Sequence, residues 1–300
     1  LSNILVFYCQ KMNYVKEPDN YAEIPDVHSN YTDSKVAILP FPYEKTTCYV
    51  KGTQKGPAAI IKASTQMELY DEECGNIFEI GICTLNQLNV GGNPEEMVKR
   101  GYENIKNLLN DNKFVVTLGG EHSITSGIVK AFKEKYNGLS VLQIDAHADL
   151  REDFEGTKHS HACAMKRTME ICPIVPVGIR SLSFEESELI KEKKLKIFWA
   201  KDIFDNDLWF NDAISMLSND VYITIDLDGF DPSIMPSVGT PEPGGLEYYQ
   251  VLRFLKKVCN KRNVVGFDVV ELCPNENDIS SDFTAAKLVY KLIGYVFGKK

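Results

Sequence analysis

Two absences in this sequence of 300 residues exclude whole classes of partner. Basic residues are in the minority, since 33 Lys and Arg face 42 Asp and Glu and the formal net charge is −9. A protein that binds nucleic acid needs cations to neutralise phosphates, so this charge argues against such a partner. No stretch approaches about 18 uninterrupted apolar residues, the length of a membrane-spanning helix. We therefore expect neither a nucleic-acid partner nor a membrane association.

Paired cysteines and a secretion signal are also absent. The eight cysteines form no Cys-x-x-Cys pair and lie scattered along the chain, which is typical of reduced thiols rather than of a disulfide framework. The opening residues 1–10 are apolar, but they lack a basic region and a small-residue cleavage site. We expect a cytoplasmic protein.

The sequence does contain a regular alternation of strand-like and helix-like segments. Its 44% hydrophobic and 25% charged residues are near the globular average, so the chain can bury a core. Strand-like apolar runs cover residues 35–40, 114–118, 140–144, 174–179, 196–199, 221–225 and 264–270. Helical spacing of apolar residues covers residues 56–70, 94–109, 123–135, 184–194, 247–258 and 281–298. This alternation predicts an α/β fold, a three-layer α/β/α sandwich with a central, mostly parallel sheet.

The predicted elements fall into one domain. Residues 1–34 are polar over most of their length and include two prolines, so we expect an irregular N-terminal segment there. Residues 35–300 show no composition shift that would mark a linker. We predict a single domain at 35–300.

Three polar segments stand where apolar runs stop. They read GGEHS at 119–123, DAHAD at 145–149 and DLDGFDP at 226–232. In parallel sheets, ligands bind beyond the carboxyl ends of the strands, so we expect all three segments at one edge of the sheet. If DAHAD stays extended, its alternate residues share a face. The candidate metal ligands are His122, Asp145, His147, Asp149, Asp226 and Asp228.

The number and type of these residues indicate a pair of divalent cations. Crowded carboxylates repel one another and cannot all stay ionised unless positive charge lies among them. Two imidazoles and four carboxylates suit Mn²⁺ better than a structural Zn²⁺, although Co²⁺ or Fe²⁺ could use the same ligands. Two ions about 3.5–4 Å apart can make a shared hydroxide nucleophilic near neutral pH. A lone Asp-x-Asp is commonly a loop cap, whereas six residues in three segments indicate a hydrolytic metal centre.

The segments GGEHS, DAHADLR and TIDLDGFDPS resemble the three signature motifs of the ureohydrolase family, which includes arginase and agmatinase. The resemblance extends from about KVAILP to DVVELCP and covers most of the chain. It implies the arginase-like α/β/α sandwich, two Mn²⁺ ions per subunit, and hydrolysis of a guanidinium group to urea and an amine. It also implies a small cationic guanidino substrate and a homo-oligomer, either a trimer or a hexamer.

The resemblance also assigns the metal ligands position by position. One ion would be held by His122, Asp145, Asp149 and Asp226. The other would be held by His147, Asp145, Asp226 and Asp228. Two of these carboxylates would therefore bridge the ions.

Three residues take catalytic roles by the same resemblance. Glu271 in FDVVELCP would bind the guanidinium, whose planar N–H donors fit a carboxylate bidentately. Asp149 would orient the attacking hydroxide. His161 would pass protons to the departing amine, a task that suits imidazole near neutral pH. His159 is the alternative, but the Ala-Cys that follows His161 resembles the family pattern and favours His161.

The substrate is predicted from the residues around these motifs. The loop GTPEPGGL at 239–246 and the segment GIRS at 178–181 resemble the agmatinase branch. Arginases place an acid shortly after Gly-Ile-Arg to hold the α-ammonium of arginine, whereas Ser181 and Ser183 stand here. We therefore expect hydrolysis of agmatine to putrescine and urea, a step of polyamine biosynthesis.

Several alternatives stay open. Arg151 is either a surface residue or a substrate-binding residue that meets a carboxylate, which would favour guanidinobutyrate. The same centre could act on arginine or on a formimino compound such as formiminoglutamate. A non-catalytic ligand-binding paralogue is disfavoured because every expected position is filled.

Overall fold

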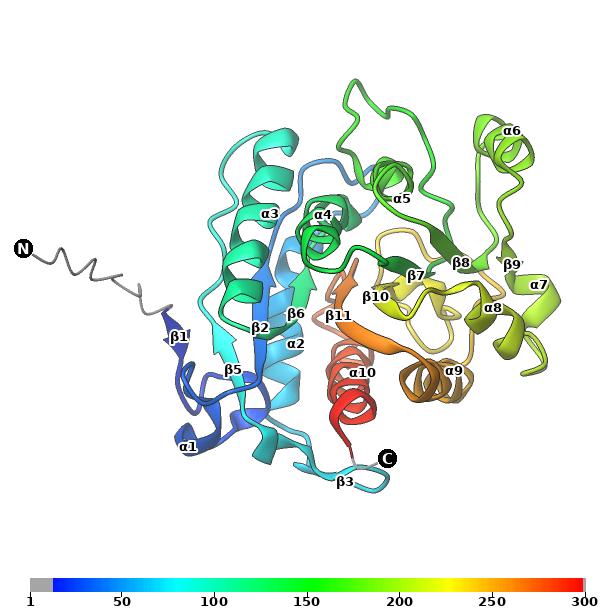
Figure 1. Cartoon of the computed structure of the whole chain (residues 1–300). Helices are drawn as coiled ribbons and strands as arrows, with labels where there is room; N and C mark the ends of the chain where they lie inside the picture. The colour runs from blue at the N-terminus through cyan, green and yellow to red at the C-terminus, as the bar shows by residue number, and fades with distance from the viewer. Residues whose placement is uncertain (1–12, 299–300) are drawn as a thin grey trace, which may run out of the picture.

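The computed structural model describes residues 13–298, and a nine-stranded sheet runs through the middle of them (Figure 1). The strand order is β1-β5-β2-β6-β11-β10-β7-β8-β9, and every strand is parallel to its neighbours except β1. Its strands are β1 Tyr14–Val15, β2 Val36–Phe41, β5 Ile82–Leu85, β6 Phe114–Gly119, β7 Ser140–Ile144, β8 Ile174–Ile179, β9 Phe198–Trp199, β10 Asp220–Asp226 and β11 Asn263–Val270. A separate hairpin joins β3 Tyr70–Asp71 to β4 Gly75–Asn76.

Helices cover both faces of this sheet (Figure 1). The α-helices are α1 Asp26–Ser29, α2 Gly56–Ser64, α3 Pro94–Asn110, α4 Thr125–Lys135, α5 Ala164–Met169, α6 Phe184–Lys193, α7 Ala200–Ile203, α8 Phe210–Met216, α9 Tyr248–Lys261 and α10 Ser280–Phe297. Three short 3-10 turns are η4 His122–Ile124, which follows β6, η6 Leu227–Gly229, which follows β10, and η5 His161–Cys163, which precedes α5.

The strands are apolar on both faces because two separate cores pack against them. In β2, Val36 and Ile38 belong to the core beneath α2, α9 and α10, whereas Ala37 and Leu39 belong to the core beneath α3, α4 and α5. Successive residues of a strand point to opposite faces, so a continuous apolar run is what two covered faces require. The predicted three-layer α/β/α sandwich with a mostly parallel sheet is confirmed.

The strand order places a topological switch at the centre of the sheet. The early strands β2 and β5 lie outside β6 on one side of the sheet, and from β7 the chain continues outward through β8 and β9 on the other. The two late strands β10 and β11 fill the gap between β6 and β7. Ligand sites in such sheets form at the carboxyl ends of the strands beside this switch.

Most predicted elements lie within two residues of the observed ones, and the differences have local causes. The helix predicted over 56–70 ends at Ser64, where the hydroxyls of Ser64 and Thr65 donate to carbonyls three residues back and complete the last turn. The strand β5 was not predicted. It is only four residues long and carries no alternating pattern.

The N-terminal segment is short of regular structure but is packed against the domain. Its described part, from residue 13, contains β1, α1 and a 3-10 turn at Tyr21–Glu23. Tyr21 is fully buried, and its hydroxyl donates to the carbonyl of Ala286 at 2.7 Å. The division at residue 34 stays a prediction, and the apolar opening at 1–10 lies outside the described residues. None of the helices in residues 13–298 has the length and apolar character that crossing a membrane requires.

Candidate metal centre

Polar residues that follow four neighbouring strands meet at the carboxyl edge of the sheet. His122 follows β6, Asp145 follows β7, Asp226 ends β10 and Glu271 follows β11. The turn after β6 depends on Gly120, because a Cβ there would lie 2.1 Å from the carbonyl oxygen of Tyr43. The glycine lets the backbone pass close to its neighbour and brings the imidazole to the edge of the sheet.

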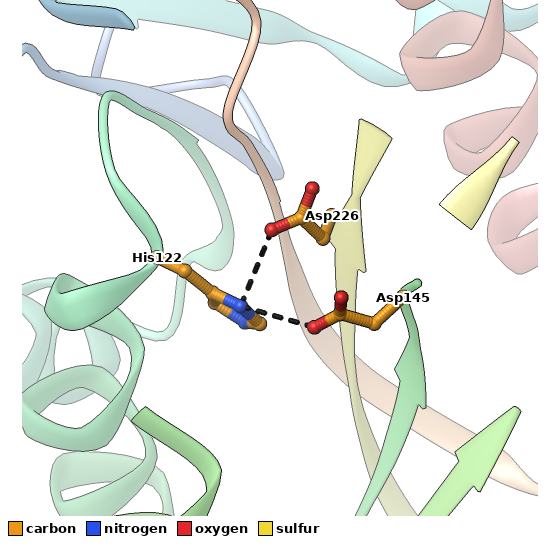
Figure 2. A group of neighbouring side chains, drawn as sticks. All are labelled: His122, Asp145 and Asp226. Carbon is orange, nitrogen blue, oxygen red and sulfur yellow. Dashed lines mark ion pairs between the residues drawn. The ribbon is translucent and has the colours of Figure 1, made fainter. Parts of the chain in front are cut away.

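His122 lies against three carboxylates, of which Figure 2 shows Asp145 and Asp226. Its Nδ1 is 3.3 Å from Oδ2 of Asp145, 3.0 Å from Oδ2 of Asp149 and 3.4 Å from Oδ2 of Asp226. The imidazole is 1% exposed, and its Nδ1 makes no hydrogen bond with any described residue. A buried ring nitrogen that faces carboxylate oxygens without a partner is suited to bind a cation.

A second group shares one carboxylate with the first. Nδ1 of His147 lies 2.8 Å from Oδ2 of Asp228 and 3.9 Å from Oδ1 of Asp145. The ligand atoms of His122, Asp145 and Asp226 and those of Asp145, His147 and Asp228 each lie close enough together to hold one ion. Asp145 therefore stands between two candidate positions. A bridging role for Asp226 stays a prediction.

The DAHAD segment reaches this arrangement by bending rather than by staying extended. The strand β7 ends at Ile144, and Asp149 has a left-handed backbone with φ of 53°. Glu271 has the same conformation, with φ of 66°. Such a backbone costs a non-glycine residue on the order of 1–3 kcal/mol, and it typically persists where function requires it. The condition that DAHAD stays extended is therefore not met, yet the candidate residues are still brought together.

A buried carboxylate fixes which nitrogen of His122 faces the cluster. The Thr224 hydroxyl donates to Oδ1 of Asp268 at 2.6 Å, so it must accept from Nε2 of His122 at 2.9 Å. The lone pair of a neutral ring is then on Nδ1, beside the three carboxylates. Asp268 is fully buried and also accepts from Tyr222 at 2.8 Å. Ligating histidines commonly have such partners, so these residues fit a metal ion.

Sequence reasoning missed Thr224 and Asp268. An aspartate inside the apolar run VVGFDVV was a usable signal, because a charge in a buried strand needs a specific partner. The threonine gave no signal, since it is ordinary in a strand.

The pKa values of the cluster residues are shifted by burial and by the neighbouring charges, and most of the shifts favour bound protons. Burial raises the pKa of Asp145 to about 7, and the charges of Asp149 and Asp228 add to the shift. Burial and neighbouring carboxylates raise the pKa of Asp226 well above its ordinary value. Burial acts against the charged forms of Asp228 and His147 too, but their mutual attraction lowers the pKa of Asp228 to about 2 and raises that of His147 to about 10.

Adding Mn²⁺ to metal-free protein is expected to raise the melting temperature more at pH 8 than at pH 6. A pKa of about 7 means that the folded state favours protonated Asp145, so the free energy of unfolding falls as pH rises from about 4 through about 7. The raised pKa of His147 extends this fall above about pH 6.5. Asp228 adds no difference, because its pKa of about 2 lies below both conditions. A bound dication offsets the repulsion and meets fewer competing protons at pH 8.

The measurement is thermal unfolding of chelator-treated protein with and without Mn²⁺ at both pH values. An ion at 100 times its dissociation constant should add about 2.7 kcal/mol to the free energy of unfolding. An equal gain at the two pH values would contradict the expected coupling, and no gain at either would contradict the metal centre itself.

A cavity of about 200 Å³ opens above the cluster. Glu271 lines it, and Oε1 of Glu271 accepts the backbone N–H of His122 at 2.7 Å. Burial and the charge of Glu121 raise the pKa of Glu271 well above its ordinary value, so the carboxylate would gain from a cationic partner. The cavity is lined by Thr47, Cys48, Tyr49, Val50, His147, Ala148, Asp149, Arg151, Phe154, His161, Ala162, Ser181, Leu182, Glu186, Asp226, Asp228, Gly239, Thr240 and Glu271.

The two candidate shuttle histidines differ in position. His161 lines the cavity, whereas His159 is not among the lining residues. Burial lowers the pKa of His159, so its environment favours the neutral ring. The geometry favours His161 for contact with a substrate. Arg151 also lines the cavity, with its guanidinium 5.2 Å from the centre of the Phe154 ring.

Comparison with known proteins places the chain in a family. A sequence profile of the arginase family matches residues 34–294. The chain belongs to the arginase family. The resemblance that the three motifs carry is thereby confirmed.

The relatives of this arginase-family protein indicate to which type of hydrolase within the family it belongs. The N(1)-aminopropylagmatine ureohydrolase of Synechocystis sp. is 43% identical over 292 residues, which cover 94% of this chain and 95% of that protein. The agmatinase of Pyrococcus horikoshii is 34% identical, covering 91% of this chain and 95% of the relative. The crystal structure of agmatine ureohydrolase of Thermoplasma volcanium matches with a TM-score of 0.83 at 31% identity, covering 91% of this chain and 93% of that one. This arginase-family protein is a hydrolase of the agmatinase type.

Proposed function

We propose that this protein is a manganese-dependent hydrolase that releases urea from a guanidino amine, with N(1)-aminopropylagmatine as its main substrate. Agmatine, the substrate predicted from the sequence, is the second candidate. One observation carries the proposal: Glu271 and the His–Asp cluster face the same cavity. The names of relatives such as the 43% identical Synechocystis protein favour the aminopropyl compound, and the 34% identical agmatinase favours agmatine.

The outer wall of the cavity suits a chain without an α-amino acid head. Apart from the cluster and Glu271, Glu186 is the only acid among the described lining residues. Its two oxygens already accept the backbone N–H groups of Leu150 at 2.7 Å and Ser183 at 2.6 Å. The α-ammonium of arginine would therefore meet only a carboxylate that two backbone donors already hold in place, and a poorly paired charge costs several kcal/mol. Hydroxyls on the wall can accept from the amine of a longer substrate.

The chemistry divides between the metal ions and the side chains. Two Mn²⁺ ions held by the six His and Asp residues would supply hydroxide near neutral pH. Glu271 would bind the guanidinium and hold its carbon in line for attack. Asp149 would orient the nucleophile by a hydrogen bond, and His161 would deliver a proton to the departing amine. The net charge of −9 would favour the approach of a cation.

A substrate panel tests the proposal. We expect urea from N(1)-aminopropylagmatine with a kcat/KM about tenfold above that of agmatine, since an added contact of about 1.4 kcal/mol gives that ratio. Arginine should react about 10³-fold less efficiently, because several kcal/mol are lost on its poorly paired head group. Urea from arginine at equal efficiency, or from none of the compounds with Mn²⁺ bound, would contradict the proposal.

The variant Arg151→Ala, tested on the same panel, distinguishes a substrate that carries a carboxylate from one that does not. If the Arg151 guanidinium binds a carboxylate on the substrate, Arg151→Ala should lower kcat/KM for 4-guanidinobutyrate and leave that for agmatine unchanged. An equal loss on both compounds would assign Arg151 to the cavity wall, where it contacts Phe154. A wild-type preference for 4-guanidinobutyrate would replace the proposed substrate.

The remaining features stay predictions. A trimer or hexamer is proposed from the family alone. A cytoplasmic location is proposed from the scattered cysteines, which form no Cys-x-x-Cys pair.

A further inference from the structure

We propose that Glu121 and Thr46 are positioning residues that fix the tautomer of His161. The inference rests on the proposed function, in which His161 moves the proton to the departing amine. Neither partner was predicted from the sequence. Glu121 lies inside the GGEHS motif without an assigned role, and Thr46 lies in a loop that carries no motif.

Glu121 is a buried carboxylate whose two oxygens are both occupied as acceptors. It is fully buried, and Oε2 accepts the backbone N–H groups of Lys45 and Thr46, each at 2.6 Å. Oε1 accepts the hydroxyls of Thr46 at 2.6 Å and Ser123 at 2.5 Å. Four donors thus hold the carboxylate in place and attach the loop at 45–46 to the turn that carries His122.

The hydrogen bond from Thr46 to Glu121 determines which hydrogen bonds the Thr46 hydroxyl can make with His161. A hydroxyl has a single hydrogen, and that of Thr46 is donated to Glu121. Its oxygen can therefore only accept from His161, whose backbone N–H lies at 3.0 Å and whose Nδ1 lies at 3.3 Å. Nδ1 must carry the hydrogen in this contact. The neutral ring then has its lone pair on Nε2, which can take up a proton and then pass it to the departing amine.

Two further contacts hold the same ring. Oγ of Ser160 lies 3.2 Å from Nδ1 of His161 and is compatible as a second acceptor of that hydrogen. The Phe154 ring meets the imidazole edge-on, with centroids 5.8 Å apart. Since Nδ1 is tied to the loop, Nε2 is the nitrogen left for the cavity that His161 lines.

His122 has the same chain of carboxylate, threonine hydroxyl and imidazole, but there the hydroxyl binds Nε2 instead of Nδ1. Asp268 and Thr224 bind Nε2 of His122 and leave Nδ1 to the carboxylate cluster. Glu121 and Thr46 bind Nδ1 of His161 and leave Nε2 to the cavity. In each case a buried carboxylate determines the direction of a threonine hydroxyl, and the hydroxyl determines which ring nitrogen is free to act.

The test measures the tautomer and the reaction separately. Full-length protein with ¹⁵N-labelled histidines contains only five imidazoles, and His161→Gln identifies the signals of residue 161. With diamagnetic Mg²⁺ bound, we expect the Nδ1–H tautomer at His161 in wild type and in Thr46→Ser, and its loss in Thr46→Val. With Mn²⁺ bound, Thr46→Val should lower kcat by about 10–100-fold with little change in KM, and Thr46→Ser should restore most of it.

Two controls keep the outcomes separable. Thr84→Val makes the same change at a buried hydroxyl that accepts from Tyr21, remote from the cavity, and should leave tautomer and kcat unchanged. Ser160→Ala should keep the Nδ1–H tautomer of His161. If Thr46→Val failed to fold, this second variant would still test whether Thr46 or Ser160 fixes the tautomer. An unchanged tautomer in Thr46→Val, or a changed one in Ser160→Ala, would overturn the inference. Absence of urea from every substrate in wild type would sink the proposed function and leave the tautomer result readable.

Discussion

Asp228→Asn is expected to reduce bound manganese from two ions per chain to about one and to lower kcat by about 10³-fold, because an ion contributes several kcal/mol of charge stabilisation. The amide keeps the shape that accepts the backbone N–H of Ala146 at 3.0 Å. It removes the charge that faces His147 at 2.8 Å. The measurements are metal analysis of dialysed protein and urea release under saturating substrate.

Asp231→Asn is the matched control for this change. Asp231 lies three residues downstream in the same loop, where its Oδ2 accepts the N–H groups of Gly244 and Gly245 and takes no part in the cluster. It should keep both ions and most of the activity. Retention of two ions in Asp228→Asn, or equal losses in the two variants, would contradict the proposed ligand set.

Glu271→Gln is expected to lower kcat/KM by about 10²–10³-fold and to leave both ions in place. The amide keeps an acceptor for the backbone N–H of His122, now at 2.7 Å from the carboxylate. It loses the charge and presents N–H donors to a guanidinium that has only donors of its own. Leaving a buried charge without its partner costs about 2–5 kcal/mol, and the expected loss corresponds to about 3–4 kcal/mol within that range.

A control variant and two contrary outcomes test the prediction for Glu271→Gln. Glu247→Gln changes an exposed acid at the start of α9 and should leave kcat/KM as in wild type. Loss of manganese in Glu271→Gln would mean that Glu271 acts through the position of His122. An unchanged kcat/KM would remove Glu271 from substrate binding.

The residues of the candidate centre were predictable because each follows directly from a local pattern. Asp145 and Asp226 stand where apolar runs stop, and the carboxyl ends of parallel strands share one edge. That reasoning needs no knowledge of strand order. It could not predict that β10 and β11 separate β6 from β7, or that DAHAD would bend at Asp149 instead of staying extended.

The contacts that orient these residues could not be predicted from the sequence, because they join distant parts of the chain. Glu271 and His122 are 149 residues apart in the chain, and Thr46 and His161 are 115 apart. Their hydrogen bonds depend on atoms that meet only after folding. A buried glutamate in GGEHS has no readable role until the loop at 45–46 is seen to donate to it.

The amino-acid sequence alone determined the layered α/β/α architecture, the family, and the candidate His and Asp ligands, because apolar runs and the residues at their ends are consecutive in the chain. Only the tertiary structure decided that Asp145 stands between the two candidate ion positions, that Nδ1 of His122 faces the carboxylate cluster, and that His161 lines the cavity. Direction in a hydrogen bond belongs to pairs of groups, and the fold brings those pairs together from distant parts of the chain.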